Sequence, residues 1–343
     1  MRYSLPKKSR RTQIDSAAAG RRALGTFDMA TQIDQVVQVL QATLSADEHT
    51  RHQAEQYLTQ HAYAKSHVVV LMQVATAPQA DASMRQSATI NLKNLIAKGW
   101  DPRREDAARL HEEDKATVRA NVLEALIQSP EIVRSQLNEC VKVIANADFP
   151  ERWPNLLETL VGYLATDDVP RVYGAVTVIS VLCRKYEYKD KDERLALTPV
   201  INAAFPRLLQ MLQSLLAMED KREDAQLALL VKAIVKTYWS ATYLDIPDAL
   251  MRGDVYGAWI QCMHAIIVMP VPERGQPADP AERKHFPWWK AKKWALHVAN
   301  RMFQRYGNPK QCKPEHKPFA EAFKRDCSCA FLESYVRLLS GAF

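Results

Sequence analysis

The sequence predicts an all-α protein made of successive antiparallel helix pairs. Apolar residues recur three and four positions apart along most of the chain, whereas the alternating pattern of a half-buried strand does not appear. Glycine is rare, at 10 of 343 residues, and short polar or proline-containing turns separate the apolar stretches. Because one helix pair cannot cover both of its apolar flanks, each pair must be covered by the next, which predicts a stacked array.

Six helix pairs account for most of the chain. We expect them at 31–44 with a helix that ends near 58, 65–77 with 82–98, 113–128 with 131–146, 154–166 with 170–186, 194–217 with 221–243, and 247–268 with 288–306. Their first helices begin roughly 34 to 53 residues apart, close to the period of about 40–47 residues of HEAT and armadillo repeats. The sequence therefore predicts a right-handed superhelical HEAT-repeat solenoid of about six to seven repeats.

Local signals mark the ends of these elements. Ser45 is the predicted N-cap of the second helix, with Glu48 three residues later completing a capping box. The segment 269–287 carries five prolines, which predicts an exposed loop without helix; a plain connection is favoured over a binding insertion. Residues 331–339 are still periodic and apolar, so we expect the array to continue beyond them.

Charge is concentrated at the amino terminus. Residues 1–28 hold seven Lys or Arg against two Asp, a balance of +5, which leaves +2 of the total +7 for the rest of the chain. This basic extension can be a transit peptide, a basic arm, or sequence translated upstream of a start at Met29; we favour an unstructured extension. The weak charge of the remainder argues against direct nucleic-acid binding, and no apolar run reaches the roughly 18–20 residues needed to span a membrane.

The sequence shows no catalytic or metal-binding pattern. The six cysteines are spread along a long chain without a secretory signal, which favours a reducing compartment. Cys312, His316, Cys327 and Cys329 are near one another in sequence, but their spacing matches no common zinc site. Walker-type phosphate loops, nucleophile elbows and paired metal-binding histidines are absent from the sequence. We therefore expect no cofactor, no metal and no enzymatic activity, and keep an enzyme using the cysteine cluster as an alternative.

The stretch "FPWWKAKKWALHVANRMFQRYG" (286–307) predicts a helix with two different faces. Its apolar positions share one side: Trp288, Ala291, Ala295, Val298, Ala299, Met302, Phe303 and Tyr306. Its basic positions follow the other side as a cationic ridge: Lys290, Lys293, His297 and Arg301. The ridge is either a solvated face or the binding site of an acidic partner, and only Trp294 is expected to face outward.

This stretch resembles the corresponding helix of the importin-β superfamily, in the subgroup of importin seven and importin eight. Other segments agree in order: "LSADEHTRHQAEQYL" (44–58), "MRQSATINLKNLIAKGW" (84–100), "VRANVLEALIQSPEIVRSQLNECVKVIANADFPERWPNLL" (118–157) and "CRKYEYK" (183–189). The turn Asp-Phe-Pro-x-x-Trp-Pro is the most distinctive of them. The resemblance covers about residues 29–339; the basic extension is outside the family pattern, and family members continue through further repeats.

The resemblance implies a nuclear import receptor that shuttles between nucleus and cytoplasm. Members of the family carry protein cargo, contact phenylalanine-glycine nucleoporins and bind the GTP-bound form of the GTPase Ran. We expect a monomer, with ribosomal proteins and histones as candidate cargo, and with no nucleic acid or membrane among its partners. An export-type karyopherin and a HEAT-repeat scaffold or adaptor outside transport remain alternatives.

The resemblance also implies a domain division and a Ran-binding surface. We expect a basic extension at 1–28, amino-terminal Ran-binding repeats at 29–110, and further repeats at 111–343. In the family the second helix of each pair contributes most to the contact with Ran. The corresponding polar positions here are Gln53, Gln56, Gln60, Gln86, Lys93, Asn94 and Lys98.

Overall fold

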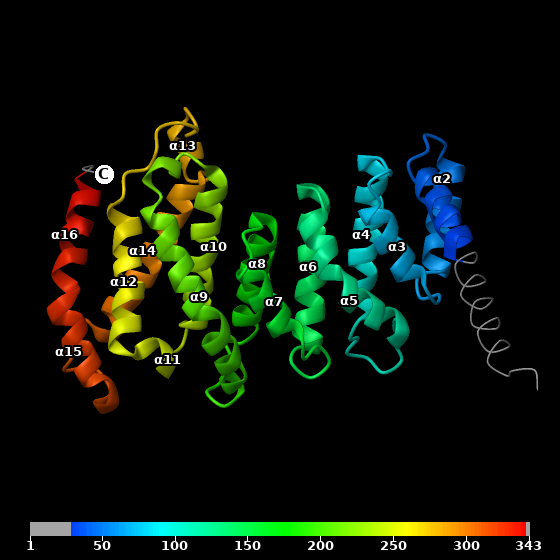
Figure 1. Cartoon of the computed structure of the whole chain (residues 1–343). Helices are drawn as coiled ribbons and strands as arrows, with labels where there is room; N and C mark the ends of the chain where they lie inside the picture. Colours follow the sequence, from blue (N-terminus) through cyan, green and yellow to red (C-terminus); the bar gives the residue numbers. More distant parts are fainter. Residues whose placement is uncertain (1–28, 341–343) are drawn as a thin grey trace, which may run out of the picture. The chain divides into compact units, whose positions relative to one another are not determined.

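The computed structural model describes residues 29–340, and within them the fold is all-α (Figure 1). The predicted fold class is thus confirmed; the predicted basic extension at 1–28 lies outside the described residues. The chain forms two compact units, Met1–Ala147 and Asp148–Phe343. The expected domain boundary near residue 110 stays a prediction.

Unit 1 contains the first helix pairs. A helix over residues 29–42 is followed by α2 (Glu48–Gln60), α3 (His67–Thr76), α4 (Ala82–Gly99), α5 (Glu112–Gln128) and α6 (Glu131–Asp148). α3 packs against both α4, its partner in the pair, and α5, the first helix of the next pair. The observed bounds lie within a few residues of those expected from apolar periodicity.

Unit 2 repeats this arrangement of helix pairs. Its elements are α7 (Leu156–Leu164), α8 (Val169–Lys185), α9 (Thr198–Ala217), α10 (Ala225–Ala241), α11 (Asp248–Met251), α12 (Gly253–Val268), α13 (Pro280–Arg283), α14 (Pro287–Tyr306), α15 (Lys317–Asp326) and α16 (Ser328–Leu339). The first helices α7, α9 and α12 pack in succession, and so do the second helices α8, α10 and α14. The unit therefore has two layers of helices, as expected for stacked helix pairs.

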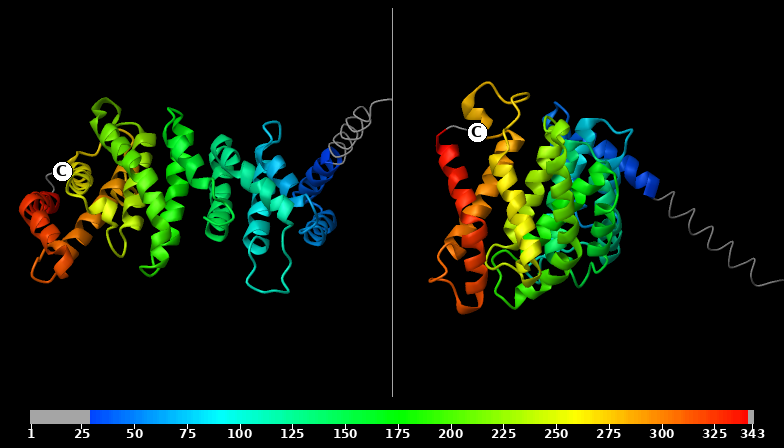
Figure 2. Two further views of the ribbon diagram at one scale, coloured as in Figure 1. Left: turned by 60° about the horizontal axis from the view of Figure 1, so that its bottom comes forward. Right: turned by 60° about the vertical axis from the view of Figure 1, so that its left-hand side comes forward.

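The last two helices are separated only by a turn at Cys327, which is shorter than the turns within the earlier pairs. α16 packs along α12, which is visible in two orientations (Figures 1 and 2), and α15 packs on α14. His264 on α12 fixes part of this contact, because its Nε2 lies 2.9 Å from the Ser334 hydroxyl. α16 thus continues the layer of first helices.

Aspartate starts four of the second helices. The side chains of Asp47, Asp81, Asp168 and Asp224 accept hydrogen bonds from backbone amides in the first turns of α2, α4, α8 and α10. These bonds satisfy amides that have no partner inside the helix. The prediction of Ser45 as the N-cap was wrong: α2 begins at Glu48, and Asp47 accepts from Thr50 N at 2.7 Å.

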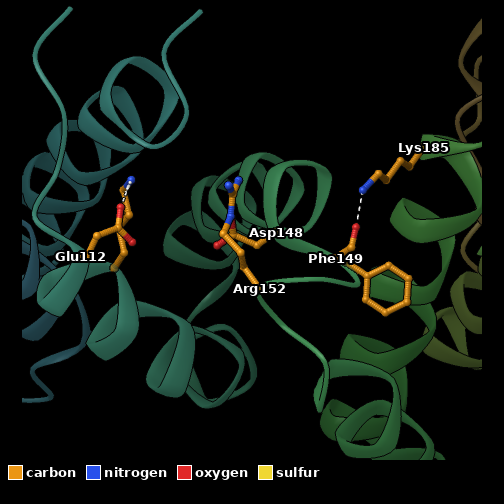
Figure 3. Close-up of polar contacts among 6 residues, drawn as sticks. Glu112, Asp148, Phe149, Arg152 and Lys185 are labelled. Carbon is orange, nitrogen blue, oxygen red and sulfur yellow. Dashed lines mark hydrogen bonds and ion pairs between the residues drawn. The ribbon is translucent and has the colours of Figure 1, made fainter. Parts of the chain in front are cut away.

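The Asp-Phe-Pro turn opens unit 2 with a buried carboxylate (Figure 3). Asp148 is 1% exposed, and its Oδ1 accepts from Arg152 Nε at 2.7 Å. The Asp148 carbonyl accepts from the backbone amides of Arg152 and Trp153. On α8, Lys185 Nζ donates to the Phe149 carbonyl, which ties the turn to the next helix pair.

The proline-rich segment differs from its prediction in one respect. Pro280–Arg283 forms one helical turn, α13, which Asp279 caps and Pro280 begins. A proline in the first turn loses no hydrogen bond, so the proline density does not exclude this short helix. Gly275 has φ 81°, which favours glycine, and the neighbouring Gln276 accepts from Trp289 Nε1 at 3.1 Å.

One helical stretch of the described chain, Glu193–Ala217, is long and apolar enough to cross a membrane by length and composition, with a mean hydropathy of 1.2. Its apolar side chains Val200, Ile201, Ala204, Phe205, Leu208 and Leu212 are buried. α9, which forms most of it, packs against α7, α8, α10 and α12. One face of α9 therefore lies in the core, while its other residues are half-buried or exposed.

Candidate interaction surfaces

The predicted Ran-binding positions on α2 are exposed. Gln53, Gln56 and Gln60 all face solvent, and Ala54 is the residue of this helix that is buried. The Gln53 amide lies 2.9 Å from His49 Nε2, and the Gln56 amide lies 2.9 Å from His52 Nε2. These pairs, four residues apart, order the polar side chains along one face of the helix.

The predicted positions on α4 form a strip opposite its buried stripe. Gln86, Asn94 and Lys98 are exposed, Lys93 is half-buried, and Ile90 lies exposed between them. The buried residues Met84, Ala88, Leu92 and Ile96 hold the other side of the helix in the core. α4 contains Arg85, Lys93 and Lys98 and no acidic residue. The strip is therefore a basic and polar surface on a fixed helix, and its role in Ran binding stays a prediction.

The apolar face expected for residues 286–307 is the core face of α14. Seven of its eight predicted positions are buried, and Phe303 is half-buried. Trp288 is 1% exposed, and its Nε1 donates to the Arg222 carbonyl at 2.7 Å. The aromatic residues of this stretch are therefore partly explained by packing.

The predicted cationic ridge on α14 is shorter than expected. Lys293 is exposed and Lys290 and His297 are half-buried, but Arg301 is only 6% exposed. Its guanidinium stacks on Trp239 and Tyr243 of the preceding repeat and donates to the Trp239 carbonyl at 2.9 Å. Desolvation, followed by the charge of Arg305, lowers the pKa of Arg301 to about 9. Including Arg301 in a partner-binding ridge was wrong, because it caps another helix.

Three arginines complete the carboxyl end of α10. Arg301 donates to the Trp239 carbonyl, Arg194 to Ala241 at 2.8 Å, and Arg305 to Thr242 at 3.0 Å. Carbonyl groups in the last turn of a helix lack partners inside it, and the helix dipole favours positive charge there. Lys292 acts in the same way on α12, because its Nζ donates to the Ile267 carbonyl at 2.6 Å.

Sequence reasoning missed the contribution of α10 to the surface around the α14 ridge. The rings of Trp239, Trp294 and His297 form a triad, with centroids 5.5–5.7 Å apart. Lys236 of α10 lies over the Trp294 ring, with Nζ 5.4 Å from its centre. Trp294, predicted to be the one tryptophan that faces outward, is half-buried within this cluster, and Trp289 is half-buried as well. In the sequence, the spacing of four residues between Lys232 and Lys236 was the signal that could have indicated a basic face on α10.

The cysteines do not form a cluster suited to a metal. Cys312 donates to the Arg305 carbonyl at 2.9 Å, Cys327 is half-buried, and Cys329 is exposed. Over residues 29–340, the structure places no three His, Cys, Asp or Glu side chains so that they could hold a metal ion. The cysteine-based alternative gains no support from this arrangement.

Comparison with known proteins places these helices in one family. Residues 54–128 match the importin-beta N-terminal domain. The chain is 38% identical over 87% of its length to the importin beta-like SAD2 homolog of Arabidopsis thaliana, covering 28% of that protein. It is 29% identical over 90% of its length to mouse importin-8, covering 30% of it.

A solved structure supports the same fold. The exportin Cse1 in its cargo-free, cytoplasmic state matches with a TM-score of 0.70 at 22% identity, over 80% of this chain and 30% of that one. The chain thus spans less than a third of the length of these relatives. From the domain match, the identities along nearly the whole chain and the stacked helix pairs, we conclude that the chain belongs to the importin-β superfamily.

Proposed function

We propose that this chain forms the Ran-GTP-binding part of a nuclear import receptor. The observation that carries the proposal is the match to the importin-beta N-terminal domain at residues 54–128, which spans most of α2 and all of α3 to α5. Six of the seven predicted Ran-binding residues lie within this match, and Gln53 lies next to it. Their side chains on α2 and α4 are exposed except for the half-buried Lys93, and this exposure supports the assignment.

The proposed mechanism is recognition without catalysis. Glutamine, asparagine and lysine side chains held on packed helices offer hydrogen bonds and positive charge at a small ordering cost. Ran changes shape with its nucleotide, so a fixed polar surface distinguishes the two forms of the partner. The chain has no phosphate-binding loop, and it senses the nucleotide only through Ran.

The remaining partners follow from the same proposal. The receptor contacts phenylalanine-glycine nucleoporins, carries protein cargo such as ribosomal proteins or histones, and shuttles between cytoplasm and nucleus as a monomer. Residues 29–110 form the amino-terminal Ran-binding repeats and residues 111–343 the further repeats. Family membership supports these points, and each needs its own measurement.

The test is the affinity of the purified chain for Ran loaded with GTP or GDP, measured by biolayer interferometry. We expect binding of the GTP form only. The variant Lys93→Ala/Asn94→Ala/Lys98→Ala should weaken binding by about tenfold or more. A matched control, Asn202→Ala/Lys313→Ala/Lys324→Ala, removes the same residue types from exposed positions of unit 2 and should bind normally. Equal binding of both nucleotide forms would refute the function; normal binding by the first variant would refute only the site.

An export-type receptor is the second candidate function. The sequence similarity to exportin-2 of Drosophila melanogaster, 27% identical over 61% of this chain, favours it. The two directions differ in how cargo and Ran-GTP interact: they compete in an importer and bind together in an exporter. The test immobilises the chain, passes a cell extract over it and adds a GTP-locked Ran. If the chain is an importer, this Ran should release the proteins that the chain has retained. If it is an exporter, the chain should retain proteins only when this Ran is present.

A further inference from the structure

The second helices of unit 2 carry basic residues without acidic ones. α8, α10 and α14 contain no Asp or Glu, but together they hold Arg171, Arg184, Lys185, Lys232, Lys236, Lys290, Lys292, Lys293, Arg301 and Arg305. The first helices α7, α9 and α12 contain Glu158, Arg207 and Asp254 as their charged residues. A chain whose described part is nearly neutral therefore concentrates positive charge on one layer of unit 2.

Several of these cations are already used inside the fold. Lys185, Lys292, Arg301 and Arg305 donate to backbone carbonyl groups. Four lysines of α10 and α14 are at least partly exposed: Lys232, Lys236 and Lys290 are half-buried, and Lys293 is exposed. We define the α10–α14 surface as these four lysines together with Trp239, Trp294 and His297.

Cationic groups of the α10–α14 surface lie close enough to act on one another. Desolvation lowers the pKa of Lys232, and the charges of Lys290 and Lys236 lower it further. Desolvation also lowers the pKa of His297, together with the charges of Lys293 and Arg301. Neither group has an acidic residue among the charges that act on it; Glu187, near Arg301, is buried and accepts from the Ser240 hydroxyl.

Like charges that are partly removed from water repel one another, and a nearby anion relieves that repulsion. The four lysines lie on two packed helices rather than on loops, so ordering them on binding costs little conformational entropy. From Lys290 to His297 the α14 strip rises about 10 Å, the length of about three residues of extended chain.

We propose that the α10–α14 surface binds an extended acidic segment of a partner protein. Carboxylates of the segment would pair with Lys232, Lys290 and Lys293, while its backbone and aliphatic groups would lie on the triad. The half-buried rings supply apolar contact area at the centre of a basic rim, as in protein-binding sites whose aromatic residues are anchors.

A single-stranded nucleic acid fits this surface less well. Its affinity would require open ring faces on which bases stack. Here Lys236 lies over Trp294, Arg301 stacks on Trp239, and His297 packs against both tryptophans. The proposal concerns unit 2 and does not depend on the binding of Ran to α2 and α4.

The test is fluorescence anisotropy with the complete chain and a labelled peptide of about eight residues that alternates glutamate and serine. We expect binding that weakens with added salt, and loss of about tenfold or more in affinity for Lys232→Gln/Lys290→Gln/Lys293→Gln. The control Lys221→Gln/Lys313→Gln/Lys324→Gln removes the same charge from exposed positions elsewhere in unit 2 and should stay within about twofold of the parent.

Three results would overturn the proposal. These are the absence of peptide binding, an equal loss in the control variant, and tighter binding of an oligothymidylate of equal length than of the peptide. Carbodiimide cross-linking followed by peptide mass spectrometry gives a second readout that does not depend on variants. It should join peptide carboxylates to Lys232, Lys236, Lys290 or Lys293 in preference to other lysines, and a random distribution would contradict the proposal.

Discussion

The guanidinium carbon of Arg301 lies 3.0 Å from the centre of the Trp239 ring, although 62 residues separate the two in sequence. The same guanidinium donates to the Trp239 carbonyl, so one side chain supplies both a stacking contact and a helix cap. This relationship removes Arg301 from the surface of α14 and links two consecutive repeats.

We expect Arg301→Met to lower the free energy of unfolding by about 1–3 kcal/mol, because it removes a charged hydrogen bond and a cation–π contact while relieving some desolvation. Arg301→Lys should recover part of the loss, since it keeps the charge but not the planar stacking group. Urea denaturation measures the free energy of unfolding of both variants. Lys293→Met, on the exposed side of the same helix, is the control and should change stability by less than about 0.5 kcal/mol. Similar losses for the two methionine variants would contradict the capping role.

Trp288 and Trp294 lie on one helix but should respond differently to the same change. Trp288→Phe leaves the Arg222 carbonyl without its buried donor and opens space in the core, so we expect a loss of about 2–3 kcal/mol. Trp294→Phe, at a half-buried position, should cost less than about 1 kcal/mol. Urea denaturation curves of the two variants give the comparison, and a reversed order would mean that the core face of α14 is misassigned.

Lys292 should make stability depend on pH in alkaline solution. Burial lowers its pKa to about 8 from an ordinary value of 10.5. Between these values the unfolded chain binds more protons than the folded one, so the free energy of unfolding rises with pH across this window. Below pH 8, Lys292 is charged in both states, so the cost of burying its charge lowers the free energy of unfolding by its full amount. The parent should gain on the order of 1–3 kcal/mol relative to Lys292→Met between about pH 8 and pH 10.

Other groups that titrate in the same range are present in both proteins, so their effects cancel in that difference. Urea denaturation of the two proteins at several pH values gives the measurement. A difference that stays constant with pH would show that Lys292 has an ordinary pKa in the folded chain.

The cysteines should separate by reactivity. Cys140, Cys183 and Cys262 are buried, and burial raises the pKa of all three thiols, to about 12 for Cys140 and about 11 for Cys262. A thiol reacts through its thiolate, so these three should react with a maleimide only when the chain unfolds. Cys329 is exposed and should react first. Mass spectrometry after timed labelling tests this order, and early labelling of Cys183 would contradict the described core.

Periodicity was sufficient to predict the helices of the six expected pairs, because each of them buries a stripe of local sequence. Met84, Ala88 and Leu92 recur every four residues, and this pattern alone places the core side of α4. The exposure of Gln86 and Asn94 followed from the same pattern. The sequence could not show which of these polar residues a partner touches, because exposure alone does not distinguish binding from solvation.

Contacts between helices that are far apart in sequence could not be predicted from the spacing of residues within one helix. Arg301 continues the spacing of Lys290, Lys293 and His297, yet it is buried because carbonyl groups of α10 lie beside it. Lys236 joins the α14 surface for the same reason, since only the packing of α10 on α14 brings it over Trp294. A helical pattern describes one helix at a time, and these residues act between two.

The capping of α10 has a consequence for how the protein is made. Ala241 ends that helix, but two of its three arginine caps are residues 301 and 305. A ribosome that adds 5–20 residues per second needs about 3–12 seconds to supply them. During translation the carboxyl end of α10 therefore lacks two of its three caps until α14 has left the ribosomal exit tunnel.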